Sequence, residues 1–381
     1  MNANHTFKYN HVVVHPFSSQ KKKTWKPFKW AEIIFKILNN NSDISISIIG
    51  AKEDFKNAVL ITNNELLSKF KDRIMNKAGK TTLEQLFNYI EKCDLLIGHD
   101  SMAGHIASIC NTQSLTISLG TVRPDETTPF FENNYNIAPN LSCFPCAIDT
   151  DCDNYQCHDK IPSQAVASAV EALISQKKID TSFLKTNKLF TNQFKIYKST
   201  FSNQGLFKLV NISMQDSSIS EVFKIIYRIC WLHLIPEIEE NTQFPKIDKK
   251  VAKELQSYIK GVTHLFELFE FGKKYTKFII EEFQLPRPGL ENIKAHSTKI
   301  DEINELLTKI QSSFPMLSPL IKYSQITLSN ITGNTIPQMA QNSFYSYQDS
   351  GLACRIVYEL IKTIFERNNI ILANNIQQSD F

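Results

Sequence analysis

Short apolar runs rich in β-branched residues alternate with amphipathic stretches over residues 12–180. This alternation is typical of successive strand and helix units that build a parallel sheet. It predicts strands at Val12 to Val14, Ile44 to Ile49, Leu95 to Ile97 and Leu115 to Ser118, with a weaker strand at Ala58 to Ile61. It predicts helices at Trp30 to Asn39, Thr82 to Lys92, His105 to Cys110 and Ser163 to Gln176. We therefore expect an α/β domain with a Rossmann-like, doubly wound parallel sheet.

The second half of the chain has a different pattern, because strand signals fade from about Thr181 and apolar residues recur at helical spacing. Three such sets are Val222, Ile225, Ile226 and Ile229; Leu265, Phe266, Leu268 and Phe269; and Ile303, Leu306, Leu307 and Ile310. Pro286, Pro288 and Gly289 predict a turn between helices, and residues 211–220 predict another connection. The chain is thus predicted to contain an N-terminal extension (1–11), an α/β domain (12–180) and an α-helical domain of unknown role (181–381).

Composition narrows the function classes. The 42 basic and 38 acidic residues give a net charge of +4, which lacks the concentrated basic face of an electrostatic nucleic-acid binder. The apolar runs end well before the roughly 18 to 20 residues that cross a bilayer, and residues 1–10 lack the apolar core of a signal peptide. We therefore expect a cytoplasmic protein of two domains, without a transmembrane segment and without a nucleic-acid partner.

The first candidate site loop follows the strand at Val12 to Val14. It contains Ser18, Ser19 and Lys23 and precedes a helix that starts near Pro27. Hydroxyl and backbone N–H groups ahead of a helix bind phosphate, and a lysine stabilises the negative charge of a departing diphosphate. The alternative for this loop is a solvated polar turn.

A second candidate loop follows Ile44 to Ile49, where Gly50 ends the strand and Glu53 and Asp54 follow. A carboxylate at this position can accept two hydrogen bonds from the diol of a ribose. Alternatively, either acid simply favours the N-terminal end of a helix through the helix dipole.

The third loop is the most informative, since a strand ending at His99 leads directly to Asp100, Ser101, Met102, Ala103, Gly104 and His105. Small residues let a backbone approach a ligand closely at the start of a helix. We expect Asp100 and His105 to face the crevice at the carboxyl end of the strand. The alternative for His105 is a hydrogen-bonding residue at the start of a helix.

Four of the eight cysteines crowd into a fifteen-residue segment with the pattern C-x2-C-x5-C-x4-C: Cys143, Cys146, Cys152 and Cys157. Four thiolates at such spacing can surround one zinc or iron ion in a reducing compartment, and His158 is a substitute ligand. We expect a structural metal here, with reduced free thiols as the alternative.

These elements occur in the order and spacing of a known family, which the chain resembles over residues 10–176. The region is similar to the C-terminal, donor-binding half of glycosyltransferase family 9, the lipopolysaccharide heptosyltransferases. The matching pieces are the Ser18-Ser19 loop with Lys23 and Trp25, Gly50-Ala51, the stretch from Ala78 to Leu86, Asp100 to His105, Gly120-Thr121 and Cys143-x2-Cys146. Some relatives in this family carry a similar cysteine finger.

The resemblance implies a GT-B enzyme that transfers a heptose-like sugar, with inversion, from a nucleotide diphosphate donor such as ADP-heptose. The acceptor would be a glycan, a lipopolysaccharide or a protein, and the enzyme would be free in the cytoplasm or peripheral at the inner membrane. Ser18, Ser19 and Lys23 would hold the diphosphate, Glu53 or Asp54 the ribose, and the turn from Asp100 to His105 the sugar and phosphates. Lys23, Asp100 and His105 are the candidate catalytic residues.

Two features depart from the family pattern. Met102 stands where the family usually has Gly or Pro, which changes the expected shape of the sugar pocket. The acceptor lobe, which supplies the base, has no counterpart before Val12, so the base is unassigned and a separate acceptor-lobe polypeptide is a candidate partner. The alternative function is a non-catalytic nucleotide-sugar-binding or scaffold protein.

Overall fold

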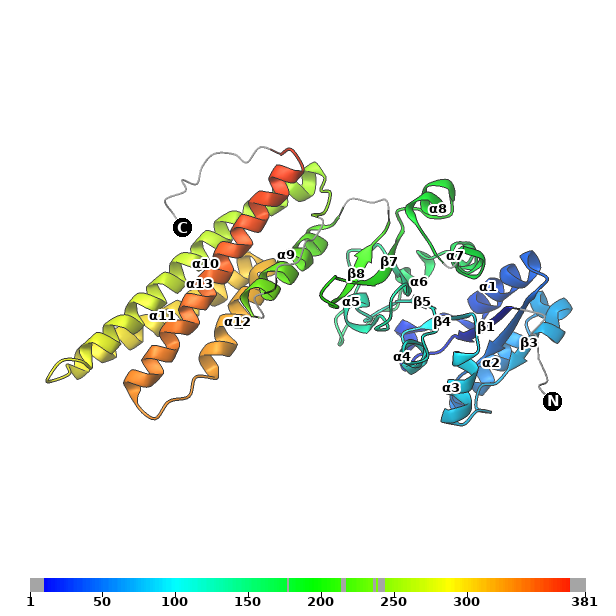
Figure 1. Cartoon of the computed structure of the whole chain (residues 1–381), viewed down its shortest axis with the longest axis horizontal. Coiled ribbons are helices and arrows are strands. Elements are labelled where there is room, and N and C mark those ends of the chain that lie inside the picture. Colours follow the sequence, from blue (N-terminus) through cyan, green and yellow to red (C-terminus); the bar gives the residue numbers. More distant parts are fainter. Residues whose placement is uncertain (1–9, 177, 214–216, 236–237, 239–243, 371–381) are drawn as a thin grey trace. The chain divides into compact units, whose positions relative to one another are not determined.

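A computed structural model describes residues 10–176, 178–213, 217–235, 238 and 244–370. The chain divides into two compact units, residues 1–215 and residues 216–381 (Figure 1). The first unit is built on one β-sheet with helices on its faces, and the second is helical. The predicted fold class, a Rossmann-like parallel sheet followed by a mostly helical region, is confirmed.

The sheet has eight strands in the order β3-β2-β1-β4-β5-β6-β7-β8. The strands are β1 (Asn10–His15), β2 (Ile44–Ile48), β3 (Ile74–Asn76), β4 (Leu95–His99), β5 (Ser114–Ile117), β6 (Tyr135–Pro139), β7 (Phe194–Phe201) and β8 (Phe207–Asn211). The first six are parallel, and β7 and β8 are antiparallel to their neighbours. Central β1 pairs with β2 through Val12↔Ile46 and with β4 through Val12↔Leu95. The strand order therefore reverses between β1 and β4, which is where doubly wound sheets bind ligands at the carboxyl edge.

Alternating residues of the central strands face two apolar layers. Val12 and Val14 pack in the layer that contains α1 (Pro27–Asn40), α2 (Phe55–Thr62) and α7 (Ser163–Gln176). Val13 and Leu96 pack in the layer that contains α3 (Leu83–Glu91) and α4 (Met102–Ile109). The remaining short helices are α5 (Pro124–Thr127), α6 (Gln156–Asp159), α8 (Thr181–Thr186) and three 3₁₀ segments at Lys21–Lys23, Lys52–Asp54 and Glu65–Arg73.

One predicted strand is wrong, because the run from Ala58 to Ile61 lies in helix α2. Ala58 and Ile61, three residues apart, are buried, whereas Leu60 between them is 60 % exposed. That spacing is helical. The third parallel strand is instead β3, an element of three residues that the apolar pattern did not indicate.

The sheet also continues past the predicted domain boundary at residue 180. β7 and β8 form a hairpin that pairs with β6, so residues up to Asn211 belong to the α/β unit. The prediction of a helical chain from residue 181 is wrong for these two strands.

The helical unit contains α9 (Ile219–Leu234), α10 (Lys249–Glu282), α11 (Leu290–Ser313), α12 (Ser318–Ser329) and α13 (Ile336–Arg367), with a 3₁₀ turn at Pro315–Leu317. The predicted turn at Pro286, Pro288 and Gly289 lies between α10 and α11. Leu265 and Phe269 of α10 share one core with Cys354 and Val357 of α13. None of the helices that the structure describes is long and apolar enough to span a membrane.

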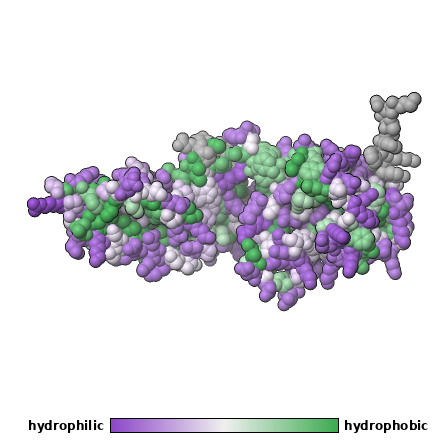
Figure 2. All heavy atoms as spheres, turned by 90° about the horizontal axis from the view of Figure 1, so that it is seen from below, coloured by the Kyte–Doolittle hydropathy of each residue, from purple (hydrophilic) through white to green (hydrophobic). Residues whose placement is uncertain are grey.

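A groove of about 500 Å³ lies along α10 in this unit. Phe266, Phe271 and Phe278 line it together with charged residues of the same helix. Four of those charges form two ion pairs: the Lys273 Nζ lies 2.6 Å from the Glu270 Oε2, and the Lys277 Nζ lies 3.7 Å from the Glu281 Oε1. The face shown in Figure 2 likewise mixes hydrophobic and hydrophilic side chains.

Candidate functional site

The three candidate loops leave the sheet at the same edge. Ser18 and Ser19 follow β1, Glu53 and Asp54 follow β2, and Asp100 follows β4, all at the carboxyl ends of parallel strands. A fourth loop, with Gly120 and Thr121, follows β5 at this edge. The structure thus places every predicted donor-binding loop around the point where the strand order reverses.

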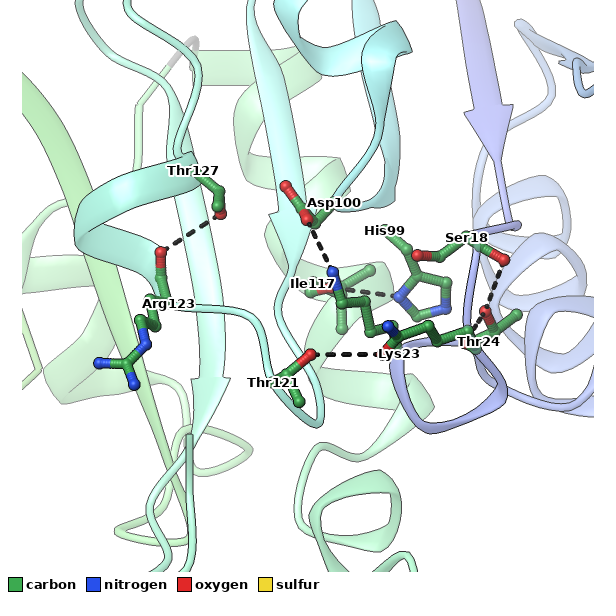
Figure 3. A network of polar contacts seen from close by, with 10 residues as sticks. Ser18, Lys23, Thr24, His99, Asp100, Ile117, Thr121, Arg123 and Thr127 are labelled. Carbon is green, nitrogen blue, oxygen red and sulfur yellow. Dashed lines mark hydrogen bonds and ion pairs between the residues drawn. The ribbon is translucent and has the colours of Figure 1, made fainter. Parts of the chain in front are cut away.

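Lys23 and Asp100 form the polar centre of this edge. The Lys23 Nζ lies 3.7 Å from the Asp100 Oδ2, and their side chains are 19 % and 14 % exposed. Figure 3 shows the lysine reaching from its loop toward the aspartate at the end of β4. The pair joins two loops that are far apart in sequence, and its partial exposure leaves the ammonium group accessible to an anion.

The backbone around Lys23 is held by the neighbouring residue Lys22. The Lys22 Nζ donates to the Ile148 carbonyl at 2.7 Å, and the Nε2 of His158 donates to the Lys22 carbonyl at 3.0 Å. A Cβ on Gly120, which has a φ of +60°, would lie 2.6 Å from that same carbonyl oxygen. Lys22 therefore fastens its loop to the cysteine-rich segment, while Lys23 points toward Asp100.

The serine and methionine of the third loop lie at the start of α4. The Ser101 Oγ is buried, and so is the Ser118 Oγ beyond the end of β5. Within the described part of the chain neither hydroxyl has a hydrogen-bond partner. Met102 is 61 % exposed. Buried hydroxyls without partners need a polar group to satisfy them, and both of these lie at the edge that holds Lys23 and Asp100.

The last three residues of the third loop differ in their exposure to solvent. Ala103 and Gly104 are buried, with the Cβ position of Gly104 only 3.0 Å from the Pro129 Cγ. His105 is exposed on the first turn of α4. The structure therefore brings Asp100 together with Lys23 and leaves His105 on the surface.

The acidic residues after β2 have different surroundings. The Asp54 Oδ2 accepts a hydrogen bond from the Ala51 N–H at 2.9 Å, whereas Glu53 is exposed. Asp54 thus stabilises the start of the local helix, which was the alternative to ribose binding for this loop. Glu53 is the acid whose carboxylate is presented to solvent at this edge.

The cysteine-rich segment does not form the predicted metal site. Cys143, Cys146, Cys152 and Cys157 are free thiols, and the described residues contain no group of three or more His, Cys, Asp and Glu placed to hold an ion. Burial raises the pKa of Cys157, and the nearby thiols of Cys146 and Cys152 raise it further. The thiols are neighbours, but the segment as folded does not fit a bound ion.

Sequence reasoning missed one residue of the site, His99. It is 3 % exposed at the end of β4, where burial lowers its pKa to about 3. Its ring contacts Trp25 and Trp30, which lie more than sixty residues away in sequence. The one local signal was a histidine inside an otherwise apolar strand.

Comparison with known proteins finds a family match over the part of the chain that contains these loops. Residues 2–155 match the model of glycosyltransferase family 9 (heptosyltransferase). The family 9 match lies at the N-terminal end of this chain, so the prediction of a C-terminal half is wrong as a position in this protein. The matched residues 2–155 include all of the candidate donor-binding loops.

Two curated relatives and two solved structures are similar to the chain. Lipooligosaccharide heptosyltransferase 2 of Campylobacter jejuni subsp. jejuni serotype O:6 is 24 % identical over 156 residues, which are 40 % of this chain and 47 % of the relative. Its counterpart from serotype O:2 is 26 % identical over 128 residues, 32 % of this chain and 38 % of the relative. The chain therefore spans less than half the length of these relatives.

Among solved structures, E. coli ADP-heptose lps heptosyltransferase II aligns with a TM-score of 0.36 at 21 % identity, covering 45 % of this chain and 48 % of that one. E. coli heptosyltransferase WaaC with ADP-2-deoxy-2-fluoro heptose aligns with a TM-score of 0.30 at 14 % identity, covering 44 % of each chain.

Proposed function

We propose that the α/β unit binds a nucleotide diphosphate sugar at the carboxyl edge of its sheet and that the protein is a family 9-like glycosyltransferase. The observation that carries the proposal is the Lys23–Asp100 pair at the reversal of strand order. The family match over residues 2–155 supports the same assignment. The donor we propose is heptose-like and carried on ADP, in keeping with the names of the similar proteins.

The proposed chemistry requires stabilisation of a leaving diphosphate. In an inverting transfer the acceptor oxygen attacks the anomeric carbon, the bond from that carbon to the diphosphate breaks, and the acceptor proton passes to a base. Lys23 would offset the charge that develops on the departing phosphate. Ser18, Ser19 and Ser101 would donate hydrogen bonds to its oxygens, together with the first N–H groups of α4.

Asp100 has two roles in this scheme. Its carboxylate keeps the Lys23 ammonium at the edge of the sheet, and it would accept hydrogen bonds from sugar hydroxyls. Glu53, being exposed, is our candidate for the ribose diol. His105 would contact the sugar from the first turn of α4. The base is assigned to no residue of this site, and we propose that it comes from a separate acceptor-lobe polypeptide.

Met102 would set the choice of donor sugar. It is the first residue of α4, and 61 % of it is exposed beside Asp100. The thioether chain occupies space that a Gly or Pro would leave open to the sugar. We therefore propose that Met102 narrows the part of the pocket that receives the heptose-like sugar.

Binding and turnover test this function separately. Isothermal titration calorimetry with ADP, UDP and GDP, and with their sugars, measures donor binding by the full chain. Lys23→Ala should weaken that binding at least 10-fold, whereas Lys21→Ala, an exposed member of the same lysine triplet, serves as the matched control. If the two variants bind equally well, the assignment of Lys23 is wrong.

A nucleotide-release assay with candidate glycan, lipopolysaccharide or protein acceptors then measures transfer. Release of the nucleoside diphosphate that depends on the acceptor supports the transferase. Binding without release for every acceptor favours the alternative, a non-catalytic nucleotide-sugar-binding or scaffold protein.

A further inference from the structure

The imidazole of His99 joins three parts of the sheet edge without facing the proposed ligand. Its Nδ1 donates to the Ile117 carbonyl at 3.1 Å, as Figure 3 shows. Its Nε2 lies 3.0 Å from the Trp25 backbone nitrogen and 3.3 Å from the Trp30 Nε1. A carbonyl only accepts, so the ring proton is on Nδ1, and Nε2 accepts both tryptophan N–H groups. One neutral ring thus connects β4, β5 and the start of α1.

We propose that His99 is a positioning residue that fixes the separation of Lys23 and Asp100. The inference rests on the proposed donor-binding function of that pair. Asp100 is the next residue along the chain after His99, and Trp25 lies two residues after Lys23. The hydrogen bond from Trp25 to His99 therefore sets the Lys23 loop against the end of β4.

The packing around the ring supports this role. The Trp25 and Trp30 rings meet the His99 ring edge to face, with centroids 5.4 Å and 5.2 Å away. All three side chains are at most 3 % exposed. A buried N–H that loses its acceptor is costly, so the loop would shift to find another partner. A shift of this loop would move Lys23 with it.

Two amide substitutions separate the two functions of the ring. An asparagine places its amide near the Nδ1 position and can keep the hydrogen bond to Ile117. A glutamine extends to the Nε2 position and can still accept from Trp25. His99→Asn therefore breaks the connection to the Lys23 loop, and His99→Gln retains it. A residue that merely fills the core would give similar results in both variants.

Titration of the full chain with ADP provides the first measurement. We expect His99→Asn to weaken ADP binding at least 10-fold and His99→Gln to stay within 3-fold of wild type. Lys23→Ala should lower ADP affinity at least 10-fold in the wild-type background but less than 3-fold in the His99→Asn background. Thr112→Val is the matched control, because it removes another buried hydrogen bond, from the Thr112 Oγ1 to the Ile90 carbonyl at 2.9 Å. It should leave ADP affinity within 3-fold.

Hydrogen exchange of the Trp25 amide provides a second measurement that needs no ligand. Exchange at least 10-fold faster in His99→Asn, with wild-type exchange in His99→Gln, supports the proposal. Equal ADP affinity and equal exchange in the two variants overturn it. If the wild-type chain binds neither ADP, UDP nor GDP, the proposed function fails, and the exchange result alone decides the role of His99.

Discussion

Acidification should destabilise the α/β unit through His99. Burial lowers the pKa of this histidine to about 3, and the nearby positive charge of Lys29 acts in the same direction. In the unfolded chain its pKa is about 6.5. The unfolded state therefore binds more protons between these values, and the stabilisation present above about pH 6.5 is lost progressively as the pH falls toward 3.

The magnitude follows from the two pKa values. Between pH 7 and pH 5 the unfolded His99 becomes almost fully protonated while the folded one stays neutral, which lowers the free energy of unfolding by about 2 kcal/mol. His15, whose pKa burial lowers to about 4, adds a loss of the same sign. A comparison of wild type with His99→Gln isolates the first contribution, because both proteins keep His15.

The assay must report on the α/β unit alone, since a chain of two units need not unfold in one step. Of the three tryptophans, Trp25 and Trp30 touch His99, and Trp231 lies in the helical unit. Urea unfolding followed by tryptophan fluorescence in a Trp231→Phe background therefore measures the unit of interest. The loss between pH 7 and pH 5 should be about 2 kcal/mol smaller in His99→Gln. The same loss in both proteins would show that His99 is not a buried neutral acceptor and would refute the reasoning.

Four further predictions concern other parts of the chain. Gly272→Ala should destabilise the helical unit by about 1 to 3 kcal/mol, because its Cβ would lie 2.6 Å from the Tyr347 ring. Gly351→Ala on α13 meets nothing nearer than 3.5 Å and should be neutral or stabilising by up to about 1 kcal/mol in urea unfolding. Thiol labelling of the native chain should modify exposed Cys143 first and buried Cys157 last. If all four cysteines are instead protected equally from labelling, and a chelator removes that protection, the segment binds a metal ion as the sequence predicted. Lys22→Ala should lower the Tm and speed amide hydrogen exchange near Ile148 and Thr150, because the Lys22 ammonium donates to both carbonyls. Unchanged exchange would show that Lys22 does not hold its loop to the cysteine-rich segment.

The parallel strands β1, β2, β4 and β5 were predictable, whereas β6, which is also buried along its whole length, was missed because Asn136 interrupts its apolar run. Val12, Val13, Val14, Leu95 and Ile97 are at most 1 % exposed, and such continuous apolar runs are typical of interior parallel strands. The run from Ala58 to Ile61 shows the limit of this signal. A stretch of four apolar residues fits a buried strand or a buried helical turn equally well, and periodicity alone does not separate them.

Strands β3 and β7 were missed for different reasons. β3 has three residues, too few for any period to emerge. In β7, Lys195 and Lys198 interrupt the apolar positions, although Lys195 is only 7 % exposed. Burial of a lysine stem against a sheet cannot be read from its charge, because the aliphatic part packs while the ammonium reaches outward.

The loops of the site were predictable, but the different contacts made by neighbouring residues within each loop were not. Lys22 and Lys23 are identical in sequence terms, yet one donates to carbonyls of the cysteine-rich segment and the other faces Asp100. His99 and Asp100 repeat this division at the end of β4, where neighbouring side chains point to opposite sides of the strand. In each pair the first residue makes a long-range contact that fixes the backbone, and the second is presented at the edge. Substitution of Lys23 or Asp100 should therefore change affinity with little effect on stability, whereas substitution of Lys22 or His99 should change stability and reach affinity only through the neighbour.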